Sequence, residues 1–170
     1  NKDYAFNGDN PFYTLRNTNS FSRDRFYGSL GATYKITDWL SANGRVGMDF
    51  FNEYRKSITQ SGTVGNISRG RGGQFGETQL YNKEVNADFM LNYDKTFGEV
   101  RIDGLLGSTY RNNLYKSQYL GASDLTVPDL YTISNVKGTP NTSMYYSESE
   151  IQSVYFAANG SYKNFLFLGL

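Results

Sequence analysis

Charged side chains lie on the polar side of alternating segments along this chain of 170 residues. A two-residue turn at Phe97-Gly98 would place Asp94 opposite Arg101 and Glu84 opposite Arg111. We expect such groups mainly to neutralise one another on a wet surface, with substrate contact as the alternative. The full set of candidates on this side is Arg45, Asp49, Glu53, Asp88, Asp94, Arg101, Asp103 and Arg111.

The amino-acid composition excludes most catalytic mechanisms. The chain contains neither Cys nor His, which excludes disulfides, thiolate zinc sites, Cys nucleophiles and the commonest general base. An enzyme would have to rely on acid pairs such as Asp88 and Asp94 alone. A net charge of +1 gives no global field that would attract nucleic acid. We therefore expect no enzyme, no metal, no cofactor and no nucleic-acid partner.

The sequence pattern predicts that β-strands position these side chains. From Phe26 to Ile36 the even positions are apolar and the odd positions mostly polar, and the pattern resumes from Leu40 to Phe50. A period of two places successive side chains on opposite faces of a sheet. The pattern recurs twice more along the chain, so we expect an all-β fold with one apolar and one polar face.

Short turns and long connections alternate along the chain. The expected hairpins cover about 22–55, 83–113 and 149–170, with the sixth strand cut at the end of the sequence. The expected long polar loops cover about 1–21, 56–82 and 114–148. Pairing Ile36 with Leu40 in the first hairpin puts Arg23 opposite Glu53. The sequence thus predicts about six antiparallel up-and-down strands.

Strand length favours a transmembrane β-barrel over a soluble sandwich. Phe26 to Ile36 spans eleven residues, whereas soluble strands average about 5–6 and transmembrane strands need roughly 9–11. Aromatic residues form 16% of the chain and gather near strand ends, as Tyr34 and Trp39 do. Unpaired amides cost several kcal/mol in hydrocarbon, and six strands cannot close around a wet interior. We therefore expect part of a larger barrel.

Two connections carry side chains that could contact a ligand. Arg69 and Arg71 lie in ISRGRGGQFG (67–76), where no Gly-Lys-Ser/Thr follows to form a phosphate loop. A flexible outer connection is the simpler interpretation, and contact with lipopolysaccharide phosphates or an acidic ligand is the alternative. Tyr145 and Tyr146 could stack on a sugar, although packing within the loop is the simpler role.

Four stretches resemble the barrel of SusC/RagA-like TonB-dependent outer-membrane transporters of Bacteroidetes. The order and spacing of these phrases carry the resemblance, which covers most of the chain. They are NPFYTLRNTNSFSRDRFYGSLGATYKITDWLSANGRVGMDFFNEYRK (10–56), EVNADFMLNYDKTFGEVRIDGLLGSTYR (84–111), LTVPDLYTISNV (125–136) and SVYFAANGSYKNFLFLGL (153–170).

The resemblance implies an active importer in the bacterial outer membrane. It implies a barrel of about 22 strands with an N-terminal plug, short periplasmic turns and long extracellular loops. The implied partners are outer-membrane lipid and lipopolysaccharide, a SusD-like surface lipoprotein, TonB, and an oligosaccharide or peptide substrate. The plug and the TonB box are not among these residues, so the chain alone is expected to transport nothing. A passive porin or a β-barrel adhesin is the alternative.

Overall fold

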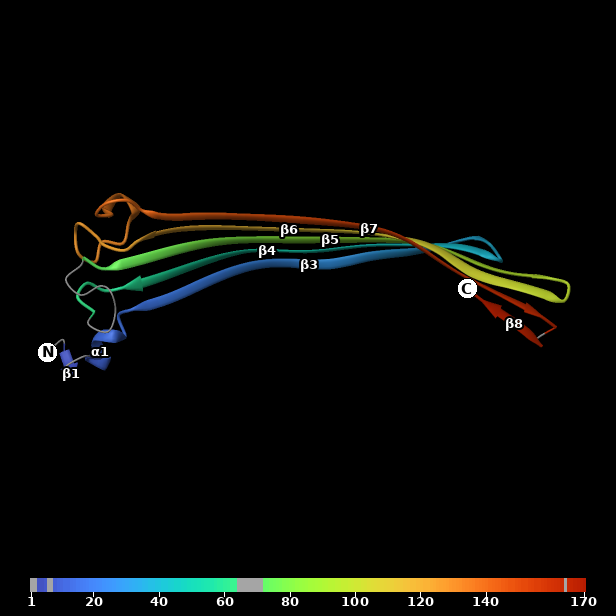
Figure 1. Cartoon of the computed structure of the whole chain (residues 1–170), viewed down its shortest axis with the longest axis horizontal. Coiled ribbons are helices and arrows are strands. Elements are labelled where there is room, and N and C mark those ends of the chain that lie inside the picture. Colours follow the sequence, from blue (N-terminus) through green and yellow to red (C-terminus); the bar gives the residue numbers. More distant parts are fainter. Residues whose placement is uncertain (1–2, 6–7, 64–71, 164) are drawn as a thin grey trace. The chain divides into compact units, whose positions relative to one another are not determined.

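The computed structural model describes residues 3–5, 8–63, 72–163 and 165–170, most of which form strands (Figure 1). Two short strands, β1 (Asp3–Ala5) and β2 (Gly8–Asp9), pair with each other and precede the short helix α1 (Pro11–Thr14). A six-stranded antiparallel sheet follows in sequence order, which confirms the predicted all-β up-and-down class. Its strands are β3 (Thr18–Thr37), β4 (Leu40–Thr59), β5 (Gln74–Phe97), β6 (Val100–Ala122), β7 (Asn141–Tyr162) and β8 (Leu166–Gly169).

The strands are longer than the sequence analysis predicts. β4 continues to Thr59, β5 begins at Gln74, and β7 begins at Asn141. The expected connections 56–82 and 114–148 therefore shrink to residues 60–73 and 123–140, and the second contains a turn of 3-10 helix, η1 (Ile133–Asn135). The added strand residues carry polar side chains on both faces, so apolar periodicity does not reveal them.

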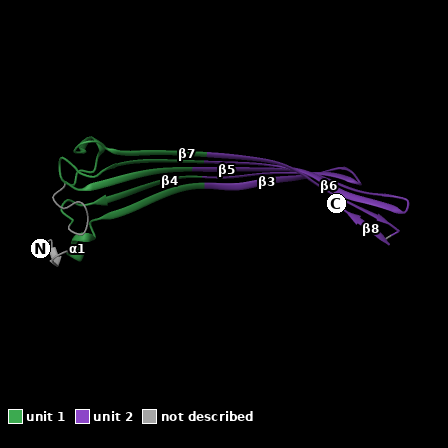
Figure 2. Ribbon diagram, in the orientation of Figure 1, with its two compact units in different colours: residues 1–25, 51–81, 115–147 green, residues 26–50, 82–114, 148–170 purple. Residues whose placement is uncertain are grey.

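The chain divides into two compact units, each built from several strand segments (Figure 2). Unit 1 comprises residues 1–25, 51–81 and 115–147, and unit 2 comprises residues 26–50, 82–114 and 148–170. Among the described residues, the buried apolar side chains are Phe75, Leu80, Ala122 and Leu125, all of which belong to unit 1. No described helix has the length and apolar character needed to cross a membrane.

Large apolar side chains of unit 2 are exposed rather than packed into a core. Leu30, Val154 and Phe156 are 81%, 77% and 69% exposed. They belong to the apolar positions of the alternating pattern, which we call the apolar face. A soluble sandwich would bury this face against a second sheet. The described part of unit 2 forms a single sheet, so its apolar face has no protein layer over it.

Aromatic rings near the ends of the apolar segments of unit 2 pair between neighbouring strands, or between a turn and a strand. The rings of Phe26 and Phe50 lie 5.6 Å apart, and Trp39 meets Tyr93 edge-on at 5.4 Å. Nζ of Lys95 lies 4.4 Å from the Trp39 ring centroid, which adds a cation–π contact. Aromatic and basic groups at both ends of an apolar band are typical of the water–lipid boundary.

Side-chain contacts support the register predicted for the first hairpin. Arg23 binds Glu53, and Thr33 Oγ1 lies 2.6 Å from Asn43 Oδ1. Both contacts follow from placing Ile36 opposite Leu40.

The second hairpin turns one residue later than predicted. β5 ends at Phe97, and the turn consists of Gly98 and Glu99, with Gly98 at φ +61°. A positive φ at the first turn position favours glycine, so Gly98 sets where the turn begins. Moving a two-residue turn by one residue shifts each partner by two positions. Asp94 and Arg101 therefore meet diagonally on the same face.

Two glycines of β6 allow close approach of β7. A Cβ at Gly104 would lie 2.6 Å from the carbonyl oxygen of Ala157, and a Cβ at Gly107 would lie 2.3 Å from Cζ of Tyr155. Tyr155 thus covers Gly107, whereas the neighbour of Gly104 is backbone that cannot rotate away.

Substitution of Gly104 should separate β6 from β7. We expect Gly104→Ala to lower the free energy of unfolding of the full-length barrel by about 1–3 kcal/mol, because the β7 backbone must shift to admit a methyl group. Urea unfolding followed by heat-modifiable gel mobility measures this effect. Gly44→Ala is the control, since a Cβ there meets nothing within 4 Å. Equal urea midpoints for the two variants would contradict the close approach.

Candidate functional site

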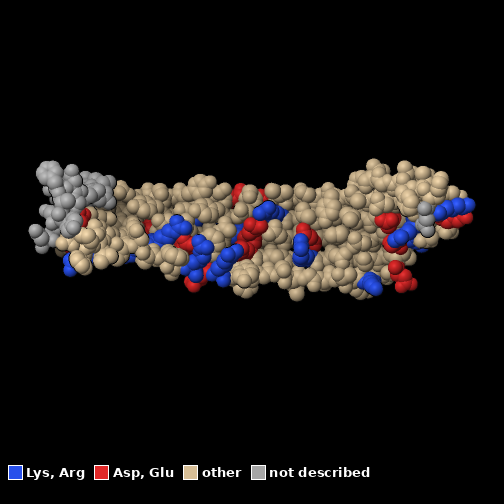
Figure 3. Space-filling model, turned by 90° about the horizontal axis from the view of Figure 1, so that it is seen from below, with Lys and Arg blue, Asp and Glu red and all other residues tan. Residues whose placement is uncertain are grey.

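Acidic and basic side chains lie next to one another on the surface seen in Figure 3 rather than in patches of one sign. The predicted ion pairs belong to the polar positions of the alternating strands, which we call the polar face. These pairs are the chemistry-bearing groups of the sheet, since the chain has neither His nor Cys. Among the described residues, no group of three or more His, Cys, Asp and Glu is placed to hold a metal ion.

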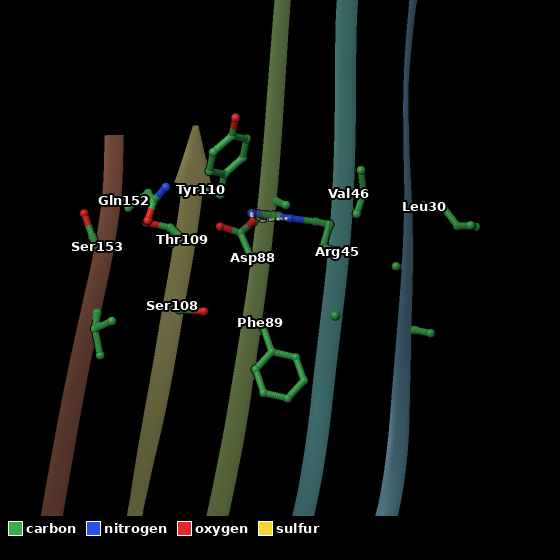
Figure 4. A pocket seen from close by; sticks show the side chains of 15 residues that line it. Leu30, Arg45, Val46, Asp88, Phe89, Ser108, Thr109, Tyr110, Gln152 and Ser153 are labelled. Carbon is green, nitrogen blue, oxygen red and sulfur yellow. Dashed lines mark hydrogen bonds and ion pairs between the residues drawn. The ribbon is translucent and has the colours of Figure 1, made fainter. Parts of the chain in front are cut away.

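Arg45 of β4 and Asp88 of β5 form an ion pair in unit 2 (Figure 4). Nε and Nη2 of Arg45 donate to Asp88 Oδ2 at 2.9 and 2.6 Å. The Arg45 side chain is 69% exposed, so water screens much of the attraction. The pair neutralises the centre of this part of the polar face and links the two strands.

Two further ion pairs of unit 2 join β5 to β6. Arg101 binds Asp94 through Nε and Nη2 at 2.9 and 2.7 Å, one bond to each carboxylate oxygen. Nη2 of Arg111 lies 3.1 Å from Oε1 of Glu84. The sequence analysis predicted both pairs. Asp103 contributes a third polar link, because its Oδ2 accepts a hydrogen bond of 2.9 Å from Asn159 in β7.

Glu53 forms a different kind of cluster in unit 1. Its carboxylate accepts from both Arg23 and Arg55, and Glu53 is only 2% exposed. The guanidinium carbon of Arg23 lies 4.7 Å from the ring centroid of Phe51. A buried carboxylate requires such partners because removing its charge from water is costly. The predicted partner was Arg23 alone, and Arg55, two residues along the same strand, completes the cluster.

Other candidates from the sequence lie apart from these clusters. Tyr145 and Tyr146 lie in β7 and not in a loop as predicted, since β7 begins at Asn141. Tyr145 contacts Tyr115 with ring centroids 5.9 Å apart, and Tyr146 faces Nζ of Lys116 at 5.5 Å. Asp49 is a half-buried residue of β4. Arg69 and Arg71 lie outside the described residues.

The sequence analysis did not predict the ordered, hydrogen-bonded structure of the connection 123–140. Asn135 is 7% exposed, and its Nδ2 donates to the carbonyl oxygens of Val127 and Leu130 at 2.7 and 2.8 Å. Its Oδ1 accepts from Val127 N at 2.9 Å. Leu125, 2% exposed, packs with Phe75 of β5. A buried amide thus supplies the backbone partners that a strand ladder would otherwise supply.

Two aspartates tie this connection to residues on either side of the stretch 64–71. Asp129 Oδ1 accepts from Ser61 N and from Tyr131 Oη, each at 2.8 Å. Asp124 Oδ1 accepts from Gly72 N at 2.7 Å. Burial and the hydrogen bond to Asp129 raise the pKa of Tyr131 above its usual value, so its hydroxyl remains a donor at neutral pH. The two long connections of unit 1 are therefore fastened together.

Removing the Asn135 amide should loosen the connection. We expect Asn135→Ala to destabilise it by roughly 2–4 kcal/mol, because three hydrogen bonds are lost and the partner backbone groups become unsatisfied. Faster cleavage of residues 123–140 by added protease, in the folded full-length protein, measures this effect. Ser134→Ala is the matched control, since its hydroxyl contacts only the exposed Thr132 side chain. Identical cleavage rates for both variants would show that Asn135 does not hold this connection.

Comparison with solved structures finds the same fold in part of a larger protein. A structure of the RagAB peptide transporter matches 98% of this chain with a TM-score of 0.75 at 12% sequence identity. The RagAB peptide importer in its closed-closed state matches 95% of the chain with a TM-score of 0.74, also at 12% identity. Its open-open state matches 98% with a TM-score of 0.63 at 13% identity.

These likenesses cover only a small share of the matched proteins. The chain spans 19%, 18% and 19% of the three matched chains, respectively. No protein-family model matches the sequence, and no characterised protein matches it by sequence comparison. The three matched structures are described as those of a peptide transporter or importer. At the level of fold, the sheet is similar to a segment of the RagAB peptide transporter, which agrees with the fold that the sequence resemblance predicts.

Proposed function

We propose that this chain forms part of the wall of an outer-membrane β-barrel that imports peptides or oligosaccharides. The observation that carries the proposal is the uncovered apolar face of unit 2, where Leu30 and Val154 are 81% and 77% exposed. Such a face requires an apolar medium, because water would make it a large aggregation-prone patch. Lipid on this face and water on the ion-paired face account for both patterns.

The apolar face also has a shape that suits lipid chains. A hollow of about 720 Å³ is lined mainly by residues of the apolar face, including Leu30, Val46, Phe89 and Val154, although Arg45 and Asp88 of the polar face also contribute to its lining (Figure 4). Gly44 and Ala87 also line the hollow, and their small side chains leave a depression between the larger ones. Acyl chains can fill such grooves without ordered contacts, and outer-membrane lipid and lipopolysaccharide are the proposed partners of this face.

We further infer that other strands complete the barrel. Within the described sheet, β3 and β8 each pair on one side only. Unpaired strand edges are not tolerated in hydrocarbon, so the proposed barrel needs neighbours for both strands. A parent barrel of about 22 strands with a plug would supply them.

The cargo, the energy source and the partners belong to the same proposal. The matched structures are described as a peptide transporter and importer, so peptide is the first cargo to test and oligosaccharide the second. A SusD-like surface lipoprotein would capture the cargo, and TonB would supply energy through parts outside this chain. The short turns would face the periplasm and the long connections the outside. Arg69 and Arg71 remain proposed contacts for lipopolysaccharide phosphate or acidic cargo.

A charge on the apolar face tests the membrane assignment. We expect Leu30→Arg to destabilise the full-length barrel in lipid vesicles by about 2–4 kcal/mol, because its guanidinium enters hydrocarbon. Ser29→Arg, at the adjacent position on the polar face, should have a much smaller effect. Unfolding midpoints and the fraction of folded barrel on gels measure both. A larger loss for Ser29→Arg would assign lipid to the wrong face and contradict the proposal.

Uptake measurements test the transport assignment. Deleting the gene for the full-length protein in its source bacterium should abolish energy-dependent uptake of its labelled peptide or oligosaccharide cargo. A proton uncoupler should abolish wild-type uptake as well, because active import draws on the inner-membrane gradient through TonB. Uptake that survives the uncoupler would identify a passive porin. Normal uptake with lost surface attachment would identify an adhesin, and either result would contradict the proposal.

A further inference from the structure

The Glu53 cluster of unit 1 differs in charge from the ion pairs of unit 2. Arg45, Arg101 and Arg111 each face one carboxylate in a one-to-one pair. Glu53 instead binds two guanidinium groups, those of Arg23 and Arg55. The cluster therefore carries one net positive charge, which partner side chains within it do not neutralise. A purely neutralising role does not account for the second arginine.

Both arginines retain donors that point to solvent. A guanidinium has five N–H donors, and the bond from Arg55 to Glu53 uses its Nε. Arg23 uses Nε and Nη2 toward the other carboxylate oxygen. The Nη groups of Arg55 bind no residue that the structure describes. The side chains of Arg23 and Arg55 are 41% and 56% exposed, against 1% for Glu53, so the donors are accessible and the carboxylate is not.

The surroundings hold the two guanidinium groups in place and leave space beside them. Glu53 anchors both groups, and the Phe51 ring lies beneath Arg23. A hollow of about 490 Å³ opens there. Glu53 supplies the only acidic side chain among the described residues that line it, and its charge is already matched. The other lining residues are Asn19, Ser20, Phe21, Lys56, Ser57, Gly76 and Thr78.

We propose that Arg23 and Arg55 form a binding site for a carboxylate group of the cargo, an inference that rests on the proposed import function. Arginine suits this role because its planar fork of donors matches the two oxygens of a carboxylate. Glu53 is the positioning residue that fixes the forks before cargo arrives, which lowers the entropy cost of binding. The carboxylate can belong to an acidic peptide or to a uronic acid.

Binding by the purified full-length protein tests this site. The peptide probes are acetyl-tetra-aspartate amide and its tetra-asparagine counterpart, and the sugar probes are trigalacturonate and its methyl ester. We expect at least one acidic probe to bind more tightly than its neutral partner, and the peptide and sugar arms identify the source of the carboxylate. Arg55→Gln should weaken acidic binding by roughly fivefold to twentyfold and leave neutral binding unchanged. The affinity of Arg55→Lys for the acidic probe should lie between those of the wild type and Arg55→Gln, because lysine keeps the positive charge but lacks the planar fork of donors.

Two controls separate a built site from general attraction. Arg16→Gln removes one positive charge from an exposed position of unit 1 outside the cluster and should leave acidic binding unchanged. Glu53→Gln raises the net charge but releases both guanidinium groups, so a built site predicts weaker acidic binding. Stronger binding for Glu53→Gln, or equal losses for Arg16→Gln and Arg55→Gln, would overturn the site. The carboxylate site would also be overturned if neither acidic probe bound more tightly than its neutral partner. If uptake remained intact and sensitive to the uncoupler in that case, the importer proposal would still hold.

Discussion

Hydrogen bonding between neighbouring backbones is the constraint on which the rest of this structure depends. A strand satisfies its amide and carbonyl groups only through adjacent strands, and hydrocarbon offers no substitute. The chain therefore runs up and down in sequence order, with each new strand added beside the last. Side chains reinforce this order, since Arg45 with Asp88 and Arg101 with Asp94 each join consecutive strands. A register error of one residue would separate these charges and move apolar residues to the polar face.

The division of the sheet into two faces explains the unusual composition. Mean hydropathy is −0.57, although the proposed function places part of the chain in a membrane. Only one face needs to be apolar, and unit 1 carries polar groups on both faces: Lys56 and Glu77 lie 2.9 Å apart at positions that alternate with that of Glu53. A low mean hydropathy is thus compatible with strands that contact lipid over only part of their length.

Alternation allowed the fold class, the register of the first hairpin and three ion pairs to be predicted: Arg23 with Glu53, Glu84 with Arg111, and Asp94 with Arg101. The pair of Arg45 with Asp88 was not predicted. Alternation failed where both faces are polar, because a strand wetted on both sides has no apolar period; β5 therefore begins at Gln74, before the predicted start of its hairpin. The one-residue error at the second turn arose from choosing Phe97 over Glu99 as the partner of Gly98. The role of Asn135 was not predicted, because a buried amide within an irregular connection produces no periodic pattern. The nearby Pro128-Asp129 pair does indicate a turn.

The fastening of the two long connections restricts how their sequences can change. A Cβ at Gly72 would lie 2.0 Å from the carbonyl oxygen of Leu125, so this position has no room for a larger residue. Asp129, at φ +61°, must keep a side chain that tolerates this backbone and still reaches Ser61. A substitution in one connection is therefore tolerated only if it keeps the contacts with the other. The two connections should consequently change together when related proteins adapt to new nutrients.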